Sequence, residues 1–139
     1  MGTDLEEFGN IKIKDIMIKD PLHIKPEEKI SKTELLMLKK NIGGLPVVQN
    51  GKLIGIITQR DIRLARFAVS LESPNTLVKD LYTPEPYILK EDDTIKDATK
   101  KMFKHDVERL PVVNRNNELV GLVLERQILE QLNYAFNQE

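Results

Sequence analysis

The chain has 139 residues, of which 40% are hydrophobic and 31% charged, a composition typical of globular proteins that excludes a disordered chain. Its 21 basic and 22 acidic residues give a net charge of −1, so nucleic acid is not an expected partner. Cysteine is absent, which excludes disulfides and thiolate chemistry and fits a reducing, cytoplasmic location. No run approaches the roughly 20 apolar residues of a membrane span, and no secretory signal opens the sequence.

The sequence contains an internal repeat. At an offset of 65 residues the motif LPVV of 45–48 returns at 110–113, and after one inserted residue in a polar turn Gly55 matches Gly121. A duplicated unit tolerates an insertion at such a surface turn. We therefore predict a leader, a first copy, a linker and a second copy at residues 1–10, 11–70, 71–75 and 76–136. The leader is expected to be either disordered or an arm that packs on the second copy.

Each copy is predicted to contain a strand, a helix, two strands and a helix, in a mixed α/β fold of the α+β type. In the first copy these are 22–25, a helix through 30–37, 45–49, 52–57, and 60 to about 69. In the second they are 87–90, a helix through 95–102, 110–114, 118–124, and 126 to about 136.

Several local signals support these elements. Asn50-Gly51 is typical of a tight hairpin turn. Thr94 with Asp97 forms a helix-opening capping box, and Ser31 with Glu34 offers one in the first copy. The run 53–57 is apolar throughout, which indicates that both faces of its sheet are covered.

The segment Thr58-Gln59-Arg60-Asp61 lies where a strand meets a helix. The simplest interpretation is structural, with Thr58 capping the helix and Asp61 complementing its positive end. The second copy has Leu124 and Gln127 at this corner, which indicates that the fold closes the same helix without the box. A ligand-binding role for Asp61 is the alternative, and the two roles are compatible.

Together these motifs resemble the CBS domain, named from cystathionine β-synthase, which occurs as tandem pairs. The motifs that carry the resemblance are GLPVV at 44–48, GIITQRD at 55–61, RLPVV at 109–113 and GLVLERQ at 121–127. The resemblance implies two β-α-β-β-α repeats packed sheet to sheet about a pseudo-twofold axis. It also implies clefts between the repeats that bind adenosine-containing ligands.

The resemblance assigns candidate ligand-binding residues. It implies that Asp61 accepts hydrogen bonds from ribose hydroxyls, that Thr58 lies near a phosphate at the helix start, and that Arg109 contacts the phosphate. Arg60 would add to the phosphate field, although a solvated helix face of Arg60, Arg63 and Arg66 is the alternative. The base is expected against Ile56, Thr83, Pro86, Tyr87, Ile88 and Val107. Tyr87 is equally compatible with a place in the core.

The mirror-image site lacks these groups, because Gln127, Leu124 and Gly44 occupy the positions of Asp61, Thr58 and Arg109. We therefore expect one competent nucleotide site. The two histidines, His23 and His105 in the loop after a helix, are interpreted as surface or half-buried residues. No catalytic or metal-binding motif is found, so the protein is not expected to be an enzyme or to hold a cofactor.

The sequence thus favours a stand-alone regulatory module that binds AMP, ADP, ATP or S-adenosylmethionine and signals to an effector protein. The alternative is a ligand-free interaction scaffold. In either case we expect a homodimer formed through exposed helices, with candidate contact residues Phe67, Leu71, Tyr134 and Phe136.

Overall fold

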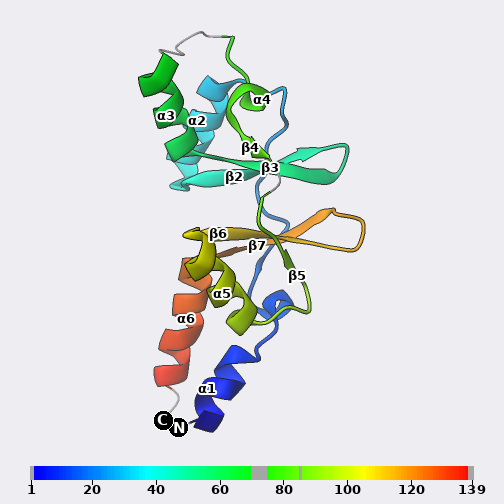
Figure 1. Ribbon diagram of the computed structural model, residues 1–139, viewed down its shortest axis with the longest axis vertical. Helices are drawn as coiled ribbons and strands as arrows, with labels where there is room; N and C mark the ends of the chain where they lie inside the picture. Colours follow the sequence, from blue (N-terminus) through cyan, green and yellow to red (C-terminus); the bar gives the residue numbers. More distant parts are fainter. Residues whose placement is uncertain (1, 70–74, 85, 138–139) are drawn as a thin grey trace. The chain divides into compact units, whose positions relative to one another are not determined.

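The computed structural model describes residues 2–69, 75–84 and 86–137 (Figure 1). The chain divides into two compact units. We call Leu22–Pro86 the first-copy unit, and Met1–Pro21 with Tyr87–Glu139 the second-copy unit. Most of the linker, including Leu71, lies outside the described residues. In the described part of the chain, no helix has the length and apolarity needed to cross a membrane.

The first-copy unit is a three-stranded sheet with three helices, its strands in the order β2-β3-β4. Its elements are α2 (Ile30–Lys40), β2 (Gly44–Gln49), β3 (Lys52–Thr58), α3 (Gln59–Val69), α4 (Val78–Leu81) and β4 (Thr83–Pro84).

The second-copy unit has a four-stranded sheet in the order β1-β7-β6-β5. Its elements are α1 (Gly2–Gly9), the 3-10 turn η1 (Ile13–Asp15), β1 (Ile18–Lys19), β5 (Leu89–Lys90), α5 (Ile95–His105), β6 (Arg109–Val113), β7 (Leu119–Leu124) and α6 (Glu125–Phe136). The predicted order of elements is confirmed in the second copy. In the first copy the helix, the two strands and the second helix are confirmed, but the predicted strand 22–25 is only an isolated parallel bridge between Ile24 and Val47. His105 is the last residue of α5 rather than part of the loop that follows, and the extended segment 87–90 is a strand only over its last two residues.

The two hairpins have the same register, as a duplication requires. Leu45 lies opposite Ile57 in the first, and Leu110 lies opposite Val123 in the second. Both have an irregularity after the same valine, Val47 or Val112, and in both that valine also pairs with a parallel segment. The shared bulge and pairings confirm that the repeat in sequence is a repeat in structure.

The segment that precedes each copy in the sequence packs in the unit of the other copy. The Ile13 N–H donates to the Asp93 carbonyl oxygen at 2.8 Å, and the equivalent Val78 N–H donates to Glu28 at 2.8 Å. β1 pairs with β7, and β4 pairs with β3. The first 21 residues therefore belong with the second copy, where α1 packs on α5 as the predicted arm would.

Two equivalent glycines allow these edge strands to approach. A Cβ on Gly55 would lie 2.3 Å from the Tyr82 ring and 2.5 Å from the Thr83 carbonyl oxygen. A Cβ on Gly121 would lie 2.3 Å from the Met17 sulfur. Real Cβ atoms essentially never come this close, so a side chain at Gly55 must displace a ring and backbone, whereas one at Gly121 must displace the Met17 side chain.

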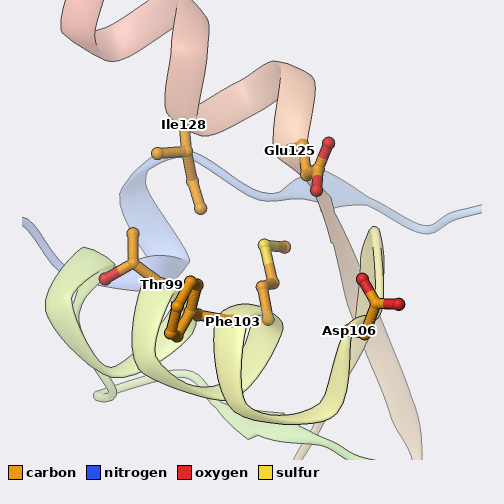
Figure 2. A pocket seen from close by; sticks show the side chains of 6 residues that line it. Thr99, Phe103, Asp106, Glu125 and Ile128 are labelled. Carbon is orange, nitrogen blue, oxygen red and sulfur yellow. The ribbon is translucent and has the colours of Figure 1, made fainter.

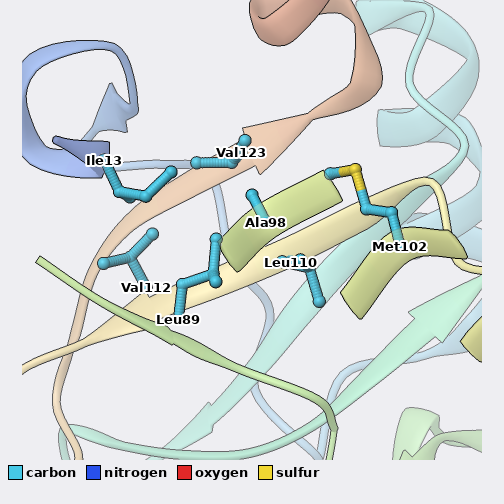
Figure 3. Packing of buried hydrophobic residues seen from close by; sticks show 7 residues of the cluster. All are labelled: Ile13, Leu89, Ala98, Met102, Leu110, Val112 and Val123. Atoms are coloured by element: carbon cyan, nitrogen blue, oxygen red, sulfur yellow. The ribbon is translucent and has the colours of Figure 1, made fainter. Parts of the chain in front are cut away.

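Matching apolar clusters fill the two units. The second-copy cluster lies between the sheet and α5, as Figure 3 shows, and consists of Ile13, Leu89, Ala98, Met102, Leu110, Val112 and Val123. The first-copy cluster has Ile30, Met37, Leu45, Val47, Ile57, Ile62 and Val78. Along β3, Leu53, Gly55 and Ile57 are buried while Ile54 and Ile56 are partly exposed. The prediction that both faces of this strand are covered is confirmed for the face of Leu53, Gly55 and Ile57, and it stays a prediction for the other face.

The helices α2 and α5 begin differently. Thr94 caps α5 as predicted, since its hydroxyl oxygen accepts the Asp97 N–H at 3.3 Å. The predicted Ser31–Glu34 box is wrong: α2 begins two residues earlier than a Ser31 cap would place it, with Lys29 at the N-cap and no side-chain cap. Glu34 instead forms an ion pair with Arg66 of α3.

Candidate ligand-binding site

A complete capping box joins β3 to α3. The Thr58 N–H donates to Asp61 Oδ2 at 2.9 Å, and the Asp61 N–H donates to Thr58 Oγ1 at 3.1 Å. Each side chain thus satisfies a backbone donor that the helix itself leaves without a partner. The capping interpretation of these two residues is confirmed.

A third residue holds the same carboxylate. Ile56 of β3 pairs with Thr83 of β4, and this register brings the Thr83 hydroxyl to Asp61 Oδ1 at 3.3 Å. The family resemblance implied that Thr83 lies beside a base. The sequence gave no sign of this hydrogen bond, because β4 is only two residues long. Thr58, Asp61 and Thr83 together form what we call the carboxylate corner.

The carboxylate corner retains capacity to bind. A carboxylate has about four lone-pair sites, and the hydrogen bonds from Thr58 and Thr83 engage one on each oxygen of Asp61. The side chain is partly exposed, and it lies at the positive end of an 11-residue helix. Such a group can accept hydrogen bonds from a diol, and the helix start beside it favours a phosphate.

The equivalent corner in the second-copy unit keeps half of the box. The Leu124 N–H donates to Gln127 Oε1 at 2.7 Å, so this amide oxygen accepts a backbone hydrogen bond at the start of α6 as the Asp61 carboxylate does at the start of α3. The interpretation that this helix closes without the box was therefore wrong in part: the acceptor is kept, and the hydroxyl and the charge are lost. Ile18 takes the place of Thr83, so the third contact is lost as well.

Arg109 provides the cationic half of the predicted set. It begins β6 opposite Leu124, and its side chain is 19% exposed. The guanidinium Nη2 lies 3.6 Å from the carboxylate of the exposed Glu108, at the outer limit of an ion pair. This weak contact leaves the planar guanidinium able to bind a phosphate.

Tyr87, Ile88 and Val107 lie in the same unit as Arg109. Val107 packs against the apolar cluster, and the Ile88 carbonyl oxygen accepts from the Lys101 ammonium group. Tyr87 is 50% exposed, so its alternative place in the core is excluded. Its ring stacks on His105, a residue expected from the sequence only to be at the surface or half-buried.

The arginines of α3 differ in their surroundings. Arg66 forms a two-pronged ion pair with Glu34, which fastens α3 to α2. Arg60, in the first turn, is exposed near the carboxylate corner. The predicted arginine face is therefore not uniformly exposed to solvent.

Pro86, another residue predicted to contact the base, is partly exposed just after β4.

A separate groove lies between α5 and α6 of the second-copy unit and does not include the predicted residues. Figure 2 shows Thr99 and Phe103 on α5 facing Glu125 and Ile128 on α6, with Asp106 at one side. Its two carboxylates would repel a phosphate, and its aromatic ring is 92% exposed. The chemistry of this groove does not suit a nucleotide.

The sequence model of the CBS domain matches the chain twice, over residues 13–67 and 78–134. The chain belongs to the CBS-domain family. Among its CBS-domain relatives, YhcV of Bacillus subtilis is 34% identical over 111 residues, which are 80% of this chain and 78% of YhcV. The inosine-5′-monophosphate dehydrogenase of Korarchaeum cryptofilum is 34% identical over 120 residues, 86% of this chain but only 24% of the dehydrogenase. The chain thus spans about a quarter of these dehydrogenases.

Solved CBS-domain pairs have the same fold. The pair of protein MJ0100, in complex with 5′-methylthioadenosine and S-adenosyl-L-methionine, is 29% identical with a TM-score of 0.78, covering 88% of this chain and 96% of that one. CBSX2 in complex with AMP is 22% identical with a TM-score of 0.82, covering 91% and 99%. CBSX2 has also been solved from Arabidopsis thaliana.

Proposed function

We propose that this CBS pair is a regulatory module that binds an adenosine-containing ligand, with Asp61 and Thr58 contacting the ribose and phosphate and Arg109 contacting the phosphate. The observation that carries the proposal is the carboxylate corner, where a charged acceptor is held in place by Thr58 and Thr83 and keeps lone pairs for a diol. Relatives in complex with AMP and with S-adenosylmethionine support the class of ligand.

The base is proposed to lie against Ile56, Thr83, Pro86, Tyr87, Ile88 and Val107, with Arg60 adding positive charge near the phosphate. A ligand that contacts both Asp61 and Arg109 can shift the equilibrium between two conformations of the protein only by its difference in affinity for them. That difference in affinity is the physical basis of the proposed signal to an effector protein.

We propose that the chain itself does not catalyse a reaction. We also propose a cytoplasmic location, which the lack of cysteine fits.

The test is a thermal-shift panel of AMP, ADP, ATP and S-adenosylmethionine. A ligand at 100 times its Kd stabilises the protein by about 2.7 kcal/mol, which raises the Tm of a chain this size by several degrees. Asp61→Ala and Arg109→Ala are each expected to abolish the shift.

The matched control is Gln127→Ala, which removes the equivalent N-terminal acceptor from α6. It is expected to lower the ligand-free Tm about as much as Asp61→Ala while leaving the ligand shift intact. No shift from any of the four compounds at millimolar concentration would refute the proposal, as would an equal loss of the shift in Asp61→Ala and Gln127→Ala.

A second candidate function, an interaction scaffold, is supported by exposed aromatic side chains on the helices. Phe67 is 89% exposed, Tyr134 64% and Phe136 72%. We propose that these residues contribute to a homodimer, since large exposed apolar groups are typical of interaction surfaces. Sedimentation equilibrium tests this: Phe67→Glu is expected to give a monomer, and a wild type that stays monomeric at millimolar protein concentration would contradict the proposal.

A further inference from the structure

Tyr87 and His105 form a parallel ring pair in the second-copy unit. The ring centroids are 3.6 Å apart and the planes differ by 10°. His105 ends α5, and Tyr87 lies two residues before β5. Tyr87 as a whole remains 50% exposed, so the residue is accessible to a ligand although its ring stacks on the imidazole.

The topology of the sheet places this pair near Arg109. Leu89 pairs with Val112 in parallel. Tyr87 precedes Leu89 by two residues and Arg109 precedes Val112 by three, so both residues lie at the edge where the parallel strands β5 and β6 begin. His105 joins this edge because only three residues separate it from Arg109.

A hydrogen bond fixes the path of the tyrosine segment. The Lys101 ammonium group, on the same helix as His105, donates to the carbonyl oxygen of Ile88. The backbone next to Tyr87 is therefore tied to α5, and the imidazole holds the ring itself. A ring that is already held loses less conformational freedom when a ligand stacks on it.

We infer that His105 is a positioning residue that holds Tyr87 as a stacking platform for the base of the ligand. The inference deepens the proposed function and rests on it. Flat aromatic faces bind any base, and each stack is worth a severalfold to more than tenfold gain in affinity. Arg109 at the same edge would bind the phosphate of the same nucleotide.

The first copy has no such platform. Its residues equivalent to Tyr87 and His105 are Leu22 and Lys40, which cannot form a ring stack. The platform is therefore confined to one copy, as the carboxylate corner is confined to the other. Neither group is required by the shared fold, since the copy that lacks it folds in the same register.

The test measures the Kd of AMP by calorimetry. His105→Ala is expected to weaken binding about five- to twentyfold, because the loss of the partner ring frees Tyr87 and forfeits part of the stacking energy. His105→Phe keeps a flat ring and is expected to bind AMP within about threefold of wild type. Lys104→Ala, at an exposed neighbouring position on α5, is the matched control and is expected to leave the Kd unchanged.

Tyrosine fluorescence supplies a signature that a purely structural role would not give. The chain has no tryptophan and three tyrosines, so its intrinsic emission reports on the tyrosines alone. Saturating AMP is expected to quench this emission in the wild type, and Tyr87→Phe is expected to remove the quenching.

Three results would overturn the inference: wild-type affinity in His105→Ala, failure of His105→Phe to restore binding, or full quenching in Tyr87→Phe. His105→Phe and Tyr87→Phe keep aromatic rings in place, so their results stand even where His105→Ala fails to fold. If the wild type binds none of the adenosine compounds, the proposed function fails together with the inference. If the wild type binds AMP and one of these three results is found, only the inference fails.

Discussion

The strand–helix corners of the two units differ in chemistry although their backbones are equivalent. Asp61 and Gln127 both accept an N–H three residues before them, at 2.9 Å and 2.7 Å. Both copies thus have an acceptor at this position, but only the first has a negative charge there. The charge of Asp61, the Thr58 hydroxyl and the hydrogen bond from Thr83 have no counterpart in the second copy, and this difference supports the proposed ligand-binding role.

The largest effect is expected at the two glycines that admit the edge strands. Gly55→Ala should lower the free energy of unfolding by about 2–3 kcal/mol, because the new methyl group meets an aromatic ring and a backbone oxygen. Gly121→Ala should cost about 1 kcal/mol, because the flexible Met17 side chain can move aside. Urea denaturation of both variants measures the difference, and equal losses would show that the two edges are equally rigid.

The next effect comes from giving the first copy the corner of the second. The double variant Thr58→Leu with Asp61→Gln keeps an acceptor for the backbone N–H of residue 58, so its free energy of unfolding should fall by only about 1 kcal/mol. The same variant should lose the AMP-induced rise in Tm completely. Retention of that rise would separate the corner from ligand binding.

The helix starts α5 and α2 provide a third comparison. Thr94→Ala removes the cap of α5 and should cost about 1 kcal/mol in urea denaturation. Lys29→Thr with Lys32→Asp builds the same box on α2 and should stabilise the protein by about 0.5–1 kcal/mol. A loss of stability in the second variant would mean that the start of α2 cannot adopt the geometry of α5.

The capped helix is also expected to respond to acid. The Thr94 N–H that donates to the Asp97 carboxylate lowers the pKa of that carboxyl below its usual value. A lowered pKa stabilises the fold above the unfolded pKa, about 3.9, and this contribution is lost as the pH falls through the folded value. This loss begins below about pH 5. Between about pH 5 and pH 3 the Tm of the wild type should therefore fall further than the Tm of Asp97→Asn. Parallel curves would contradict this.

The smallest effect is expected for the ion pair between α2 and α3. The side chains of Arg66 and Glu34 are 41% and 33% exposed, so solvent screens their attraction. A double-mutant cycle of Arg66→Ala and Glu34→Ala should give a coupling of about 0.5 kcal/mol that falls in high salt. A coupling unaffected by salt would indicate that packing of the arginine stem, rather than charge, joins these helices.

The sequence predicted what periodicity and turn chemistry encode. The hairpins, the Thr94–Asp97 box and the Thr58–Asp61 box follow from short-range patterns and are confirmed. The residue types of the Ser31–Glu34 box fit, but the helix starts two residues earlier than that box requires, at Ile30, whose N–H donates to the Thr76 carbonyl oxygen of a distant segment. Only tertiary contact decides that boundary.

The rest of the candidate site depended on long-range pairing that no local pattern encodes. β1 and β4 are two residues each, too short to show any alternation, so the hydrogen bond from Thr83 to Asp61 was not predictable. The stacking of His105 was missed for a similar reason, since its partner ring, Tyr87, lies 18 positions earlier in the chain. The roles of Asp61 and Arg109 toward a ligand stay predictions.

The packing of the first 21 residues with the second copy sets an order of events during synthesis. The first-copy unit has all its residues once Pro86 has left the ribosome, whereas Ile18 must wait for Leu122 before its strand can pair. Until then the buried face of Ile13 has no core to join. Truncation of the N-terminal segment should accordingly damage the half of the protein that is made last and spare the half that follows it directly in the chain.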